Sequence, residues 1–177
     1  MKTYLNPKKE EWNALLKRPT MDYAAIEKRI QPIMEAVADK GDEALFQFTE
    51  QFDRVKLSGL AVTAAEFSVA DALVEEGLKA AILMAKNNIE TFHRAQQQEE
   101  LMVETMPGVK CYRKSVAIEK VGLYVPGGTA PLFSTVLMLG VPAKIAGCRE
   151  IVLCTPPNAE GKVHPAILFT AKAIGIE

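Results

Sequence analysis

The stretch VGLYVPGGTAPLFSTVLM, residues 121–138, decides the fold of this chain. A short apolar run at residues 121–125 ends at Tyr124-Val125, a proline–glycine turn follows at residues 126–128, and an apolar helical segment begins at or near Pro131. A second apolar run at residues 151–154 comes after that segment. Strand, glycine turn, helix and strand in this order predict a βαβ unit, and therefore a parallel sheet with a right-handed crossover.

Helical patterns precede this unit. Asp22 is a candidate N-cap for a first helix, in which Pro32 predicts a kink or a split. Thr63 and Glu66 have the spacing of a capping box and predict a further helix start. The clearest helix follows, and its apolar residues recur on one face: Leu78, Ile82, Ala85, Ile89 and Phe92. The fold class predicted is α/β, with an N-terminal helical part followed by a partial parallel sheet.

A polar run at residues 96–100 and the turn signal Pro107-Gly108 predict a boundary between domains. We therefore expect an N-terminal arm at residues 1–20, a helical part at 21–105 and a second domain at 106–177. In the second domain residues 109–118 are expected to form a strand, and a final helix to run from His164-Pro165 to Gly175.

Composition excludes several classes of protein. The chain is 49% hydrophobic and 24% charged, as globular proteins are, and its net charge is -1 with scattered basic residues, so nucleic-acid binding is not indicated. No apolar stretch approaches the ~20 residues of a membrane span. Three cysteines without C-x-x-C spacing indicate neither a disulfide framework nor a zinc ribbon, and they favour a reducing, cytoplasmic setting.

The turn after the first strand of the βαβ unit is the best candidate for a ligand site. Free N–H groups and the positive end of a helix dipole there are suited to a phosphate or a dinucleotide. The alternative is a tight turn that needs glycine only for its backbone dihedrals. Tyr124 is likewise open to two interpretations, a ligand contact or a core residue with its hydroxyl at the surface.

Other candidates for chemistry are weaker. His93 is interpreted as a packed or interface residue and His164 as a residue that caps or precedes a helix. Two distant histidines without an adjacent acidic motif do not predict a zinc site within this chain. Cys148 and Cys154 are expected to be small buried hydrophobes.

Four collinear blocks of the chain resemble the histidinol dehydrogenase family. They are residues 121–138, PAKIAGCREIVLCTPP at 142–157, KGDEALFQFTEQFD at 40–53 and NIETFHRAQ at 88–96. The resemblance implies incomplete Rossmann-like units, similar in fold to those of aldehyde dehydrogenases. It also implies a homodimer that uses zinc and NAD to oxidise L-histidinol to L-histidine, with this chain as the N-terminal part.

The same resemblance assigns cofactor contact to the turn, where Tyr124 matches the family's NAD-contacting tyrosine and Pro126, Gly127 and Gly128 shape the pocket. The family's catalytic pair and zinc ligands lie beyond the matched segment. We therefore expect no catalytic residue or zinc ligand here, no tightly bound cofactor, and no activity from the chain alone. A non-catalytic binding module and one chain of a split enzyme are the alternatives.

Uncovered apolar surface also predicts association with a second copy. We expect a homodimer or a larger species, with the stripe of Leu78, Ile82, Ile89 and Phe92 as a candidate contact surface.

Overall fold

The computed structural model describes residues 2–18, 22–127 and 130–176. The chain separates into two compact units, Met1–Leu45 and Phe46–Glu177, and helix α3 (Asp42–Phe52) contains the boundary. The boundary predicted between residues 105 and 106 falls inside a strand of the second unit. The division into an arm and two Rossmann-like parts stays a prediction.

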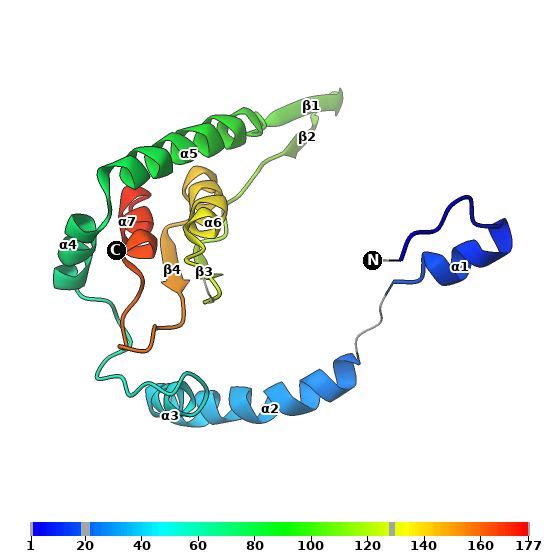
Figure 1. The fold of residues 1–177 in the computed structure, drawn as a ribbon. Coiled ribbons are helices and arrows are strands. Elements are labelled where there is room, and N and C mark those ends of the chain that lie inside the picture. The colour runs from blue at the N-terminus through cyan, green and yellow to red at the C-terminus, as the bar shows by residue number, and fades with distance from the viewer. Residues whose placement is uncertain (1, 19–21, 128–129, 177) are drawn as a thin grey trace. The chain divides into compact units, whose positions relative to one another are not determined.

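The first unit contains η1 (Lys9–Glu11), α1 (Trp12–Leu15) and α2 (Tyr23–Lys40) (Figure 1). The predicted N-cap is confirmed, because the Asp22 carboxylate accepts a hydrogen bond from the amide of Ala25 at 3.1 Å. Helix α2 continues through Pro32, so the predicted split is wrong. A proline removes one backbone hydrogen bond, and the others keep this helix continuous.

The second unit holds most of the regular structure. Its remaining elements, in chain order, are α4 (Ala64–Leu73), α5 (Glu76–Ala95), β1 (Leu101–Met106), β2 (Val109–Arg113), β3 (Lys120–Tyr124), α6 (Phe133–Ala146), β4 (Glu150–Cys154) and α7 (Pro165–Ala173). Helices α5, α6 and α7 pack against one another, and α4 packs against α7 (Figure 1). The unit is therefore a mixed α/β structure, as predicted.

Strands β1 and β2 form an antiparallel hairpin around Pro107 and Gly108, whose φ is 83°. The expected strand at residues 109–118 ends earlier, at Arg113, and its partner β1 lies within residues 96–108, for which the sequence predicts only a polar stretch and a turn. That interpretation is wrong, because β1 is stabilised by pairing with β2 and local composition does not reveal such pairing. Every residue of the hairpin is exposed.

Strands β3 and β4 are parallel, with α6 between them in the chain, so the predicted βαβ unit is confirmed. Their register pairs Lys120 with Glu150 and Tyr124 with Cys154. Leu123, Ile151 and Leu153 on one face pack against the hydrophobic core. The opposite face, which includes both pairs just named, is exposed.

The core of this unit lies among α6, α7 and the strands. Its buried members are Val125, Val136, Leu137, Val141, Ile167, Ala171, Ile174 and Ile176. Helix α5 contributes Ala85 and Ile89 to the edge of this core, and its Ile82 is only 1% exposed. The predicted use of this stripe as a surface for a second copy is therefore wrong at these positions, because the chain's own helices cover them.

The boundaries of the last two helices follow their terminal residues. Helix α6 begins at Phe133, later than Pro131 suggested, and Leu132 is its N-cap. The N-terminus of α7 is confirmed: Pro165 occupies the first turn, and Nδ1 of His164 accepts a hydrogen bond from the amide of Ala166 at 3.2 Å.

Candidate functional site

The carboxyl ends of β3 and β4 lie side by side and form the edge at which α/β proteins bind ligands. Tyr124 ends β3 on the open face of the sheet, opposite Cys154, and is 64% exposed. The interpretation of Tyr124 as a core residue is wrong in this structure, because its strand position directs it to the uncovered face. The ring is therefore accessible to a ligand.

The turn that follows Tyr124 is anchored at its first residue. Val125 is fully buried, and its amide donates to the Cys154 carbonyl at 2.9 Å, which extends the strand pairing by one bond. Pro126 and Gly127 come next and are exposed. Gly128, the fourth predicted site residue, lies outside the described residues.

The N-terminus of α6 follows this turn in the chain. Its N-cap, Leu132, has no side-chain acceptor, so the first amides of the helix receive no bond from a capping side chain. Such amides, together with the helix dipole, favour an anionic group nearby. An exposed aromatic ring and an uncapped helix start within nine residues suit a ligand that carries both a ring and a phosphate.

The other titratable candidates take structural positions. His93 is half-buried and lies edge-on to Phe92, with 5.6 Å between ring centroids, in agreement with the packed interpretation. Cys154 is exposed rather than buried, because it lies on the uncovered face of β4, whereas Cys148 is partly buried. Among residues 2–18, 22–127 and 130–176, no group of three or more His, Cys, Asp or Glu side chains could hold a metal ion.

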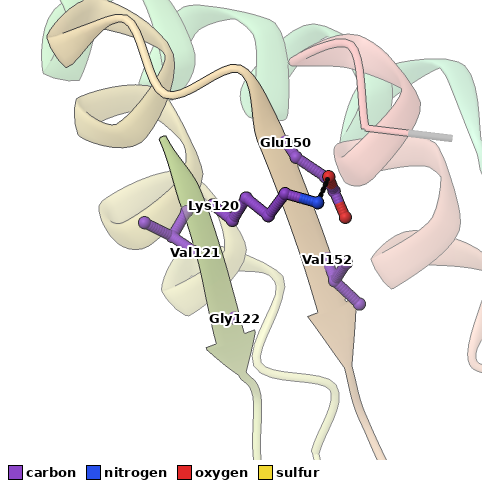
Figure 2. A pocket seen from close by; sticks show the side chains of 5 residues that line it. All are labelled: Lys120, Val121, Gly122, Glu150 and Val152. Atoms are coloured by element: carbon purple, nitrogen blue, oxygen red, sulfur yellow. Dashed lines mark ion pairs between the residues drawn. The ribbon is translucent and has the colours of Figure 1, made fainter. Parts of the chain in front are cut away.

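A shallow hollow of about 200 Å³ lies on the open face of the sheet, toward the amino ends of the strands (Figure 2). Lys120 and Glu150 line it and form an ion pair of 2.7 Å across β3 and β4. None of the predicted site residues lines this hollow. Because Lys120 and Glu150 are the first residues of β3 and β4, their ion pair joins the two strands at the end opposite to Tyr124.

A second hollow of about 250 Å³ lies among α5, α6 and α7. Its charged groups already have partners: Glu90 pairs with Arg94 and with Lys86, and Lys144 donates to the Gly175 carbonyl. The hydrogen bond from Arg94 is the main reason why the pKa of Glu90 lies below its usual range. The ion pairs of Glu90 lie within α5, and the bond from Lys144 ties α6 to the residues that follow α7. In the part of the chain that the structure describes, no helix is long and apolar enough to cross a membrane.

The parallel βαβ unit places the chain in the α/β class of folds, whose ligands commonly bind beyond the carboxyl ends of the strands. The family model for histidinol dehydrogenase matches residues 16–177. The chain is 54% identical over 176 residues to the histidinol dehydrogenase of Bacteroides thetaiotaomicron and 48% identical over 165 residues to that of Vibrio cholerae. These matches cover 99% and 93% of this chain.

A solved structure gives the same assignment. The crystal structure of histidinol dehydrogenase from Elizabethkingia anophelis matches 99% of this chain with a TM-score of 0.94 and 45% sequence identity. The chain belongs to the histidinol dehydrogenase family, a family of oxidoreductases, as its sequence blocks indicate. It spans about two fifths of the length of these proteins: 41% of the Bacteroides and Elizabethkingia chains and 37% of the Vibrio chain.

Proposed function

We propose that these residues form the N-terminal part of an enzyme that oxidises L-histidinol to L-histidine with NAD and zinc. The observation that carries the proposal is the 54% identity over 176 residues to the Bacteroides thetaiotaomicron enzyme. The TM-score of 0.94 to the Elizabethkingia anophelis structure supports it independently. The family shares its fold with this chain over nearly all of the chain's length.

NAD accepts a hydride from the substrate when it is bound, and the described residues fit a role in holding it. Tyr124 presents an accessible ring, and the turn at Pro126 and Gly127 leads toward the start of α6. We propose that Tyr124 contacts the cofactor, that Pro126, Gly127 and Gly128 shape the wall beside it, and that the first amides of α6 face its phosphates. These residues bind and orient, and they move no proton.

Zinc does not fit the described residues, since they supply no ligand set. We therefore assign no step that involves zinc to this chain. The zinc ligands and the acid–base groups belong, in our proposal, to the part of the protein that the relatives have and this chain does not span. The 177-residue chain alone is then inactive and holds neither cofactor tightly.

A homodimer is the proposed assembly and the cytoplasm the proposed location. No side chain of α2 is buried within its own unit, although Ile26, Ile30, Ile33 and Val37 recur on one face. That face offers apolar surface to a partner. Light scattering of the 177-residue chain at tens of micromolar tests the proposed homodimer. A compact monomer at that concentration would rule the homodimer out. Cysteines that form no disulfide suit a reducing compartment.

The direct test joins residues 1–177 to the remaining part of the Bacteroides thetaiotaomicron enzyme, which gives a full-length hybrid. We expect the hybrid to form NADH from histidinol, and the 177-residue chain alone to form none. A folded hybrid without turnover, beside an active Bacteroides enzyme, would contradict the proposed function. Turnover by the 177-residue chain that survives repurification would contradict the placement of the catalytic groups.

A further inference from the structure

Gly127 lies against the loop that follows β4. A Cβ atom added to Gly127 would stand 2.6 Å from Cγ of Pro156, closer than Cβ atoms approach any neighbour, and 3.6 Å and 3.7 Å from the Cβ and Cδ atoms of that ring. Sequence reasoning missed Pro156, since nothing local links it to a residue 29 positions earlier in the chain. The structure brings the two loops into contact.

Space, rather than backbone conformation, requires glycine at this position. Gly127 does not adopt the positive φ found at Gly41, Gly108, Gly147, Gly161 and Gly175. The interpretation that the turn needs this glycine only for its dihedrals is therefore wrong for Gly127. Any larger residue would displace either the turn or the proline ring.

Both sides of this contact are held in place. Val125 is fully buried and bonded to Cys154, which fixes the start of the turn relative to the end of β4. Pro156 is half-buried and follows Cys154 by two residues. Its ring locks φ and has little freedom to yield, unlike the end of a long flexible side chain. The ring of Pro156 therefore sets how far the turn can move toward the β4 loop.

We propose that Pro156 is a positioning residue for NAD: its ring seats the Gly127 turn and so sets the placement of Pro126 and Gly127 beside the cofactor. This inference rests on the proposed function. Pro156 carries no donor or charge at its ring and acts only through the turn. The effect of disturbing it should fall on NAD and leave histidinol unaffected.

The test measures KM for NAD and for histidinol in variants of the full-length hybrid. Gly127→Ala should raise the KM for NAD at least about fivefold, the change that strain in an overpacked site produces. Adding Pro156→Ala should return that KM toward the value of the Pro156→Ala variant. The truncated side chain leaves its own Cβ as the nearest atom, at the ordinary contact distance of 3.6 Å.

Pro157→Ala is the matched control. It removes a proline from the same loop, but Pro157 is not among the nearest contacts of Gly127. Pro157→Ala should neither change the KM for NAD nor rescue Gly127→Ala. The KM for histidinol should stay constant in all variants, which separates positioning of the cofactor from a general loss of structure.

An unchanged KM for NAD in Gly127→Ala, or equal rescue by the two proline variants, would overturn the inference. So would a change confined to the melting temperature. These outcomes differ from failure of the proposed function. In that case the hybrid without these substitutions forms no NADH from histidinol, or it oxidises histidinol at the same rate with and without NAD. That failure would overturn both.

Discussion

Gly140 allows close packing between α6 and the residues that follow α7. A Cβ atom at Gly140 would overlap Cδ1 of Ile174 and lie 3.3 Å from Cδ1 of Ile176, and both isoleucines belong to the core. Glycine inside a helix costs about 1 kcal/mol relative to alanine. The space occupied by these two side chains leaves no room for a Cβ atom, which accounts for glycine in α6 despite this cost.

We expect Gly140→Ala to lower the free energy of unfolding by about 1–3 kcal/mol, the usual cost of overpacking a core. Ile174→Val removes the nearest atom, so the double variant should lose less than the sum of the two single changes. Urea denaturation of the chain measures both. Gly77→Ala is the control, because Gly77 is also helical and has open space around it. Equal effects at Gly77 and Gly140 would contradict this account.

Among the elements, α4 begins with a complete capping box. The Glu66 carboxylate accepts bonds from the amide and the hydroxyl of Thr63, each at 2.8 Å, and the Thr63 hydroxyl accepts from the amide of Glu66 at 3.3 Å. The bond from the Thr63 amide is the main reason why the pKa of Glu66 lies below 4.5. The carboxylate of Glu66 therefore stabilises the folded chain at pH values above 4.5. This contribution is lost as the pH falls through the pKa of Glu66 in the folded state, which is the lower of the two.

Thr63→Ala should cost about 1 kcal/mol at neutral pH. Glu66→Gln should also destabilise the chain there, and its difference from the wild type should narrow as the pH falls well below 4.5. Glu75→Gln is the control, because the side chain of Glu75 makes no capping bond at the start of α5. Urea denaturation from neutral pH to well below pH 4.5 measures the free energy of unfolding of each variant. A difference for Glu66→Gln that stays constant with pH would be inconsistent with the capping role.

The stripe on α5 tests whether the chain covers its own helices. Ile82 is 1% exposed, so Ile82→Ala should cost about 2–5 kcal/mol in the free energy of unfolding. Met84, on the same helix, is 66% exposed, and Met84→Ala should change stability by less than about 0.5 kcal/mol. If both variants were near neutral, the stripe would be free in solution and open to a second copy, as the sequence alone suggested.

Local signals predicted the elements that local bonds stabilise. The caps at Asp22, Thr63 and His164 were predictable because each side chain bonds an amide two or three residues away. Strand β1 was missed because its partner, and not its own composition, makes it a strand. The role of Pro156 at the candidate site was hidden for the same physical reason: steric contacts between distant loops leave no periodic pattern in the sequence.

At the level of the whole molecule, family membership and the βαβ unit agree, and the chain spans 41% of the Bacteroides thetaiotaomicron relative's length. In our proposal this portion supplies one wall of the cofactor site, and the remaining portion supplies the zinc and the groups that transfer protons. In the same proposal, the cofactor reaches Tyr124 from the open face of β3 and β4, where its ring is exposed.

The most direct measurement of this claim is the KM for NAD in the full-length hybrid that carries Tyr124→Ala. Tyr112→Ala is the matched control, because Tyr112 is 71% exposed and lies on the β1–β2 hairpin, not at the carboxyl ends of β3 and β4. We predict that Tyr124→Ala raises the KM for NAD about tenfold, equivalent to about 1.4 kcal/mol, with the KM for histidinol and the melting temperature unchanged. Tyr112→Ala should alter none of the three. An unchanged KM for NAD, together with a large fall in melting temperature for Tyr124→Ala, would contradict the claim.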